Sequence, residues 1–280
     1  MHLWYRYRIV TFTVALWSGD LIGTWIQAQS FHTSLPIYAE VAFRWGPTAT
    51  RIVILIGAIT ALLGFALRLW GSSYLGRNSV WSTTPRTQLL IENGPFAWVR
   101  NPLYLGNFFV VLGFAPGVAP LGILGAILAL GVTQRWAIRH EEQEMLTKFG
   151  TRFVAYMNAV PRWLPNSWQP KRPSFDERSN SISLQNGISA EMYTVGIVIS
   201  LFLWALGPPQ VRELPSLIIL IGLVVQLLVN VRRRVFESTH SVYDHILRPQ
   251  KSAQAAHSEP KVAHPDQRQP AKQSPAQRDF

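Results

Sequence analysis

Three glutamates lie close together in a short polar stretch that directly follows a long apolar run. Glu141, Glu142 and Glu144 all lie within five residues of Arg139. Carboxylates placed where a helix leaves a bilayer are unfavourable when they are buried without a partner. The pattern therefore predicts that this stretch binds a cationic ligand or pairs with arginine side chains.

A second polar stretch precedes the same apolar run and has the pattern of a helix start. Asn101 suits the capping position and Pro102 the first helical position, while Gly94-Pro95 predicts a turn upstream. The unpaired backbone N–H groups of such a helix end would point at the neighbourhood of Arg100 and attract carboxylates or phosphates. This stretch is therefore a candidate anion-binding site.

The apolar run between the two stretches, residues 103–138, is too long for one membrane helix. Roughly 20 apolar residues span the hydrocarbon core, and Pro116 and Pro120 interrupt this run near its middle. Prolines at this place favour two helices that turn back on each other. A helical hairpin would bring the two polar stretches together at one membrane face.

The composition of the 280-residue chain indicates a membrane protein. It is 48% hydrophobic and 15% charged, whereas soluble domains carry about 25% charged residues. Its net charge is +11, but the basic residues cluster beside the apolar runs, which favours anionic lipid headgroups over nucleic acid as partners. The chain has no cysteine, which excludes thiol nucleophiles, disulfides and cysteine-ligated metal sites.

The apolar runs predict the fold class, an all-α, polytopic integral membrane protein of about six transmembrane helices with a central helical hairpin. The first run is interpreted as an uncleaved span, because it exceeds the apolar length of a signal peptide. The third run supplies the two legs of the hairpin. The five runs that meet or approach spanning length are residues 9–28, 52–70, 103–138, 192–207 and 214–231.

The distribution of basic residues predicts the orientation. Of the 26 Lys and Arg residues, only Arg44, Arg51 and Arg212 fall in loops on the side opposite the N-terminus. The positive-inside rule then places both termini and both polar stretches in the cytoplasm, with the protein in the inner or plasma membrane.

The distribution of apolar and polar residues predicts four regions in the chain. The C-terminal region lacks large apolar residues, and its composition predicts disorder. The regions are a four-helix core over 1–168, a linker over 169–189, an accessory transmembrane hairpin with a juxtamembrane helix over 190–247, and a tail over 248–280.

The residues from Arg100 to Gly106 resemble a known motif. Their order, Arg-Asn-Pro-Leu-Tyr-Leu-Gly, is similar to the Arg-His-Pro-x-Tyr-x-Gly motif of the isoprenylcysteine carboxyl methyltransferase and phospholipid methyltransferase superfamily. Gly94-Pro95-Phe96 resembles the Gly-Pro-Tyr that precedes it. The second polar stretch resembles the family's later series at Glu141-Glu142, Phe149-Gly150, Tyr156 and Val160-Pro161. The resemblance covers roughly residues 50–166.

The resemblance implies a methyltransferase that uses S-adenosylmethionine, held by these motifs in a cytoplasmic pocket. Glu141 or Glu142 would bind the cationic end of the cofactor, and a helix N-terminus or an arginine would suit its carboxylate. Asn101 stands where the family has histidine, so no imidazole is available there. The implied cofactor-binding residues are Gly94, Asn101, Pro102, Tyr104, Glu141 and Glu142, and no metal site is expected.

The chemistry of the methyl acceptor stays open. Methyl transfer from a sulfonium mainly requires alignment and exclusion of water. A carboxylate acceptor needs only an arginine to orient it, and Arg139, Arg100 and Arg162 are the candidates in that order. An amine acceptor would need a base such as Glu92 or Glu144. Carboxyl methylation of a lipophilic acceptor is favoured, and the alternatives are N-methylation of a phospholipid amine and a non-catalytic scaffold.

Two other acidic features are weaker candidates. Asp20 lies within the first apolar run, where it is either a functional acid or the partner of a polar group on a neighbouring helix. Glu237, His240 and Asp244 share a helical face at a spacing that metal ligands can have. Nothing nearby completes a coordination shell, so a solvated helix is favoured there.

Overall fold

The computed structural model describes residues 8–31, 35–75, 90–166, 170 and 182–208, together with isolated positions between 218 and 231. The chain divides into two units, Met1–Val231 and Arg232–Phe280, and all described residues belong to the first. The predicted tail, together with Glu237, His240 and Asp244, lies outside the described residues.

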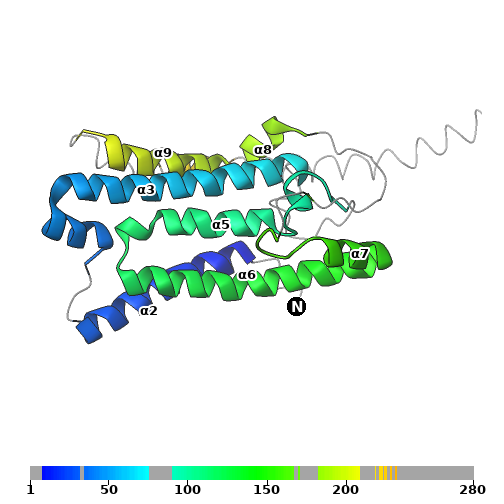
Figure 1. Cartoon of the computed structure of the whole chain (residues 1–280), viewed down its shortest axis with the longest axis horizontal. Coiled ribbons are helices and arrows are strands. Elements are labelled where there is room, and N and C mark those ends of the chain that lie inside the picture. Colours follow the sequence, from blue (N-terminus) through cyan, green and yellow to red (C-terminus); the bar gives the residue numbers. More distant parts are fainter. Residues whose placement is uncertain are drawn as a thin grey trace, which may run out of the picture. The chain divides into compact units, whose positions relative to one another are not determined.

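All regular elements in the described part of the chain are helices, as Figure 1 shows. This confirms the all-α prediction. The helix α3 breaks at Gly46, where φ is 79°, just before Pro47. The elements are α2 (Arg8–Phe31), α3 (Ile37–Leu75), η1 (Gly94–Ala97), α5 (Pro102–Gly113), η2 (Ala115–Gly117), α6 (Pro120–Phe149), α7 (Thr151–Ala159), α8 (Leu184–Ala190) and α9 (Met192–Leu206).

The apolar run 103–138 folds as the predicted hairpin. Its first leg, α5, begins at Pro102, and its second leg, α6, begins at Pro120 after the short turn η2. Proline suits both starts, because the first helical turn leaves its N–H groups unpaired anyway. Since α6 continues without a break to Phe149, the glutamate-rich stretch is the extension of the second leg.

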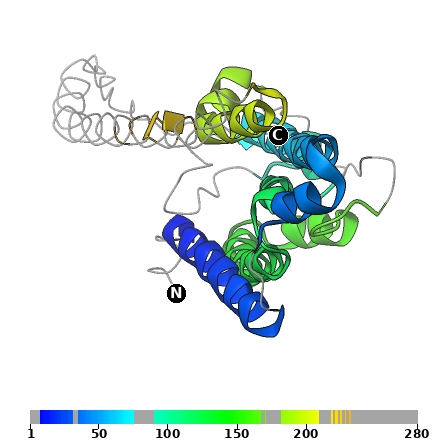
Figure 2. The ribbon, with the colours of Figure 1, turned by 90° about the vertical axis from the view of Figure 1, so that its left-hand side faces the viewer.

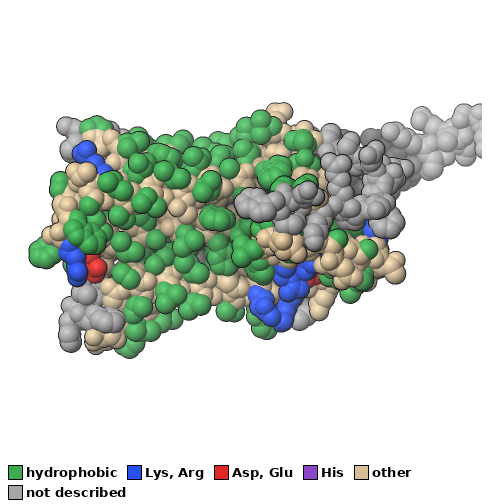
Figure 3. All heavy atoms as spheres, in the orientation of Figure 1, with side chains coloured by type: hydrophobic (Ala, Val, Ile, Leu, Met, Phe, Trp, Pro, Cys, Tyr) green, Lys and Arg blue, Asp and Glu red, His purple; other side chains and the backbone are tan. Residues whose placement is uncertain are grey.

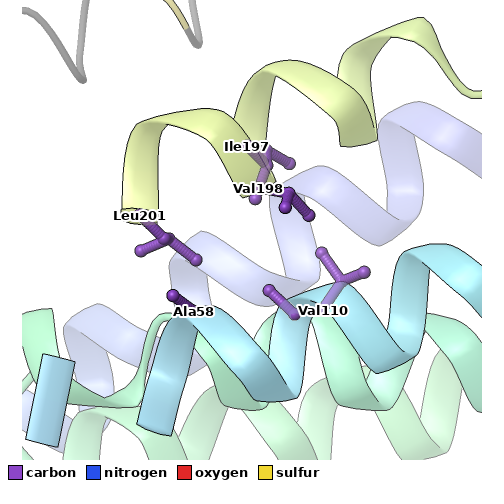
Figure 4. Packing of buried hydrophobic residues seen from close by; sticks show 6 residues of the cluster. Ala58, Val110, Ile197, Val198 and Leu201 are labelled. Carbon is purple, nitrogen blue, oxygen red and sulfur yellow. The ribbon is translucent and has the colours of Figure 1, made fainter. Parts of the chain in front are cut away.

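The helix α3 packs against more helices than any other described element. It packs against α5, α8 and α9, while α2 packs along α6 (Figure 2). The helix α8 occupies the end of the predicted linker. A cluster of buried apolar side chains joins α3, α5 and α9 and is seen in Figure 4: Ala58, Ala61, Val110, Ile197, Val198 and Leu201. The helix α9 therefore packs on α3 and shares a buried cluster with Val110 of α5, the first leg of the hairpin.

The helices cross closely because glycines lie at the crossings. Gly64 of α3 faces the backbone of α5, and Gly19 of α2 faces Gly125 of α6. A Cβ added at Gly64 would lie 2.7 Å from both the Gly106 oxygen and the Val110 nitrogen. Small residues of this kind allow helices in a membrane to approach each other closely.

Large apolar side chains are exposed along the long helices. Ile56 and Leu63 of α3 and Leu128 and Val132 of α6 are each more than half exposed. The face drawn in Figure 3 is largely covered by hydrophobic side chains, and its Lys and Arg side chains lie toward the two ends. Soluble monomers rarely expose apolar patches of this extent, so the surface fits contact with lipid acyl chains.

The prediction of about six membrane spans is not confirmed. Among the described residues, α3 and α6 are long and apolar enough to cross a membrane, and α8 with α9 makes a third if this pair, bent by 69°, is one span. The first leg α5 is apolar but has only 12 residues. The helix α2 covers the first predicted span, but Asp20 and Gln27 add polarity to it. The run 214–231 lies mostly outside the described residues.

We expect Gly64→Ala to destabilise the protein relative to Gly131→Ala. Both changes add one methyl group inside a helix and gain up to about 1 kcal/mol of helix propensity. At Gly64 the methyl group meets the backbone of α5, and such overpacking typically costs about 1–3 kcal/mol. At Gly131 the nearest atom, on the Phe108 ring, is 3.8 Å away. Thermal unfolding in detergent measures both variants, and equal midpoints would contradict the close crossing of α3 and α5.

Candidate functional site

The two polar stretches meet at the end of the hairpin where α5 begins. The Nε of Arg100 lies 3.1 Å from Oε1 of Glu142. The hydroxyl of Tyr104 donates to Oε1 of Glu141 at 2.8 Å. These contacts confirm the expectation that the hairpin brings the two stretches together.

Glu142 is the centre of an ion-pair cluster. Its Oε1 accepts from the Nε atoms of Arg100 and Arg162 at 3.1 and 3.2 Å, and its Oε2 accepts from Nη2 of Arg162 at 2.5 Å. The side chains of Arg100 and Glu142 are only 11% and 13% exposed, so salt screens their attraction weakly. The negative charge of Glu142 is thus compensated by the chain itself.

Arg100 also holds the segment that follows α7. Its Nη1 donates to the carbonyl oxygens of Met157 and Val160 at 2.6 and 2.7 Å, and its backbone N–H donates to Pro161 at 2.8 Å. Hydrogen bonds from a charged donor are stronger than neutral ones. The arginine of the first motif and the Val-Pro of the second stretch therefore form one structural unit.

Asn101 occupies the N-cap position of α5 but its side chain does not cap the helix. Its Nδ2 donates to the carbonyl oxygen of Arg162 at 3.2 Å, and no cap hydrogen bond forms. The predicted position of the helix start at Pro102 is correct. The capping role expected of the Asn101 side chain is wrong. Its amide nitrogen binds the segment after α7, and its amide oxygen accepts no hydrogen bond from the first turn of α5.

The turn at Gly94 is fixed by contacts with α3 and α7. Gly94 has a φ of 61°, which glycine adopts readily, and a Cβ there would lie 2.4 Å from the ring of Tyr74. The carbonyl oxygen of Phe96 accepts from the hydroxyl of Tyr156 at 2.8 Å. Burial raises the pKa of Tyr156, and the nearby charge of Arg100 opposes this shift. The phenol is therefore protonated at neutral pH and available as a donor.

The other predicted residues lie outside this cluster. Arg139 is exposed on α6 and, within the described residues, forms no hydrogen bond or ion pair. Glu92 is buried and pairs with Arg152 at 3.4 Å, and Glu144 is half-buried on α6. The structure thus brings two of the three candidate arginines to Glu142 and leaves Arg139 apart from them. In α2, Asp20 accepts a long hydrogen bond of 3.5 Å from Thr24 of its own helix.

Three buried polar side chains add to the predicted set. Arg68 of α3 and Glu191 form an ion pair of 2.7 Å. A charge within an apolar run is a signal that could have identified Arg68, whereas no local pattern points to its distant partner. Gln134 of α6 is fully buried, and its side-chain amide has no hydrogen-bond partner in the described part of the chain. It lies two helical turns before Glu141, on the same side of α6.

Comparisons with known proteins agree with the motifs. Residues 52–152 match the family described as phospholipid methyltransferase. The chain is 27% identical over 146 residues to the protein-S-isoprenylcysteine O-methyltransferase of Rattus norvegicus, an alignment that covers 51% of this chain and 49% of the rat protein. It is 33% identical over 81 residues to the enzyme of the same name from Homo sapiens, covering 28% of each chain.

A bacterial protein with a different name is also similar to the chain. The chain is 24% identical over 146 residues to the cobalt-zinc-cadmium resistance protein CzcN of Cupriavidus metallidurans, covering 51% of this chain and 63% of that protein. The alignments span 28% to 63% of the lengths of these three relatives. No solved structure matches the chain.

The family match includes the second part of α3, the turn η1 and the whole hairpin, and it ends in α7. It therefore contains the first motif and the second polar stretch as far as Phe149-Gly150, and it confirms the resemblance seen in the sequence. Together with the apolar helices, this indicates a membrane protein whose residues 52–152 match the phospholipid methyltransferase family and which is similar to isoprenylcysteine O-methyltransferases over about half of its length.

Proposed function

We propose that the chain transfers a methyl group from S-adenosylmethionine to a lipophilic acceptor, and that a carboxylate is the favoured acceptor group. The observation that carries this proposal is the contact of Tyr104 with Glu141 beside the ion-pair cluster of Glu142. It places the N-terminus of α5 next to an acidic part of α6. The family match and the isoprenylcysteine O-methyltransferase relatives support methyl transfer and a hydrophobic acceptor.

The side chains at this position suit a donor that is cationic at one end and anionic at the other. When bound, S-adenosylmethionine supplies an electrophilic methyl group on a sulfonium, and it also carries an ammonium and a carboxylate. Glu141, which accepts from the hydroxyl of Tyr104 beside the start of α5, is the candidate for the cationic end. The first turn of α5, which the Asn101 side chain does not cap, suits the carboxylate.

The engagement of two arginines leaves Arg139 as the candidate that orients the acceptor. Arg100 and Arg162 are both held by Glu142. Arg139 is exposed on α6, three residues before Glu142 and therefore close to the same helical face. A carboxylate acceptor is already ionised, so an orienting guanidinium is all that it requires from the protein besides alignment with the methyl group.

An amine of a phospholipid is the second candidate acceptor, because the matched family is named for phospholipid methylation. An amine must lose a proton before it attacks, which requires a base. Glu92 is already engaged by Arg152 at 3.4 Å, so Glu144 is the remaining candidate. Carboxyl methylation needs fewer groups and stays the favoured activity.

Glu141→Gln is expected to weaken the binding of S-adenosylmethionine at least about tenfold, since a hydrogen bond to a charged group contributes about 1.5–3 kcal/mol. Isothermal titration calorimetry on the full chain in lipid nanodiscs measures this. Glu40→Gln is the matched control, because it removes a carboxylate from the first turn of α3, and its affinity should equal that of the wild type. A wild-type protein that does not bind the donor would overturn the proposed function and favour the scaffold. An unchanged affinity of Glu141→Gln alone would overturn only the role of Glu141.

The methylated product is expected to be a base-labile ester. Membranes that contain the protein are incubated with donor labelled in its methyl group, and mild base then releases labelled methanol from esters but not from methyl amines. Arg139→Gln should lower the ester signal about tenfold or more through loss of a charged hydrogen bond to the acceptor, whereas Arg135→Gln, which is exposed one turn earlier on α6, should not. A base-stable label would instead establish the amine reaction.

A further inference from the structure

A buried ion pair connects α3 to the start of α9. The Nε of Arg68 lies 2.7 Å from Oε2 of Glu191, and its Nη2 lies 3.0 Å from Oε1. Arg68 is 5% exposed and Glu191 is fully buried. Paired hydrogen bonds of this kind fix the plane of the guanidinium as well as its position. The orientation of Arg68 therefore depends on a residue that is far away in the sequence.

Two hydroxyl groups complete the surroundings of the Glu191 carboxylate. Ser72 of α3 donates to Oε1 at 2.7 Å, and the hydroxyl of Thr194 of α9 is shared between the backbone carbonyl oxygen of Glu191 at 2.6 Å and Oε2 at 3.1 Å. Each carboxylate oxygen thus accepts one hydrogen bond from Arg68 and one from a hydroxyl. A buried ionic group that is fully hydrogen-bonded is rigid, so Glu191 is a fixed support for the arginine.

The remaining nitrogen of Arg68 reaches the first turns of α5. Its Nη1 donates to the carbonyl oxygen of Leu103 at 3.4 Å and to the side-chain oxygen of Asn107. These two residues flank Tyr104, the residue that contacts Glu141. Gly106 leaves room for the arginine, since a Cβ there would lie 2.5 Å from Cγ of Arg68. One guanidinium therefore joins α9 to the part of α5 that carries the first motif.

The partners of Arg68 belong to different parts of the chain. Arg68, Leu103 and Asn107 lie within the family match over residues 52–152, whereas Glu191 and Thr194 follow it. The segment with α8 and α9 thus contributes a charged residue to the support of the motif helix, in addition to its apolar packing on α3.

We propose that Arg68, held by Glu191, is a positioning residue that fixes the first turns of α5 and thereby holds Tyr104 opposite Glu141. The segment of α8 and α9 is then a functional part of the donor site. This inference rests on the proposed function for its link to S-adenosylmethionine. The mechanical part, which is the anchoring of α5, can be measured without any ligand.

A double variant distinguishes the loss of α5 positioning from a general loss of folding stability. Removing one member of a buried ion pair leaves an uncompensated charge, whereas replacing both members by apolar residues of similar volume is often neutral or stabilising. The variant Arg68→Met with Glu191→Leu removes both charges and also the contact with α5. Asn107→Ala is the second variant, because it removes the accepting side chain on α5 and leaves the ion pair in place.

The experiment uses the full chain in nanodiscs of phosphatidylcholine and phosphatidylglycerol. Hydrogen exchange is followed at the amides of residues 105–107, which bond to the carbonyl groups of the first turn of α5, and the affinity for S-adenosylmethionine is measured by calorimetry. We expect exchange at these amides to become about tenfold faster and donor affinity to fall about tenfold in the double variant, while the thermal midpoint changes little. Asn107→Ala should shift both quantities in the same direction. Thr60→Ala, which removes an exposed hydroxyl that bonds to Ile56 of its own helix α3, is the control and should change neither.

Wild-type exchange and wild-type affinity in both the double variant and Asn107→Ala would overturn the proposal. Faster exchange with unchanged affinity would overturn the link to the donor site. If the double variant does not fold, Asn107→Ala decides. If the wild type does not bind the donor, the proposed function fails, and the exchange data alone decide whether Arg68 fixes α5.

Discussion

The pairing of one carboxylate, Glu142, with two arginines holds the polar end of the hairpin together. Arg100 comes from the stretch before α5, and Arg162 from the segment after α7. Since Arg100 also binds two carbonyl oxygens of that segment, the start of α5, the end of α7 and the extension of α6 share one set of charged contacts. A group removed from such a set would leave buried charge without compensation, so the three elements depend on one another for their positions.

The features that local sequence signals encode could be predicted. Pro102, Pro116 and Pro120 mark the starts and the turn of the hairpin, and the structure has helix boundaries at two of them and the turn at the third. The meeting of the two polar stretches followed from this hairpin. The division of roles between Glu141 and Glu142 did not, because adjacent residues of a helix point about 100° apart and only the folded chain decides which one faces Tyr104 and which one faces the arginines.

Individual side-chain contacts between distant segments could not be predicted from the sequence. Arg68 and Glu191 are separated by more than the length of the matched family region, and neither position shows which partner it has. The side chain of Asn101 also departs from its local pattern, because it does not cap α5 and its amide nitrogen donates to the distant carbonyl oxygen of Arg162. The number of spans is not confirmed for another reason. Among the described residues, α5 has too few residues for a span and α2 carries polar side chains, while the run 214–231 lies mostly outside the described residues.

The unequal legs of the hairpin have a consequence for the surrounding lipid. The 12 residues of α5 extend about 18 Å, and the 30 residues of α6 about 45 Å, against about 30 Å of hydrocarbon. A leg of this length that starts at one membrane face would end within the hydrocarbon. The N–H group of Phe114 is bonded to the carbonyl oxygen of Val111 in α5, those of Gly117 and Val118 to carbonyl oxygens of Phe114 and Ala115, and Pro116 is buried. Non-helical backbone at that depth is tolerated when its polar groups are satisfied and covered by protein, so the short leg can end inside the membrane without exposing unpaired peptide groups to the lipid.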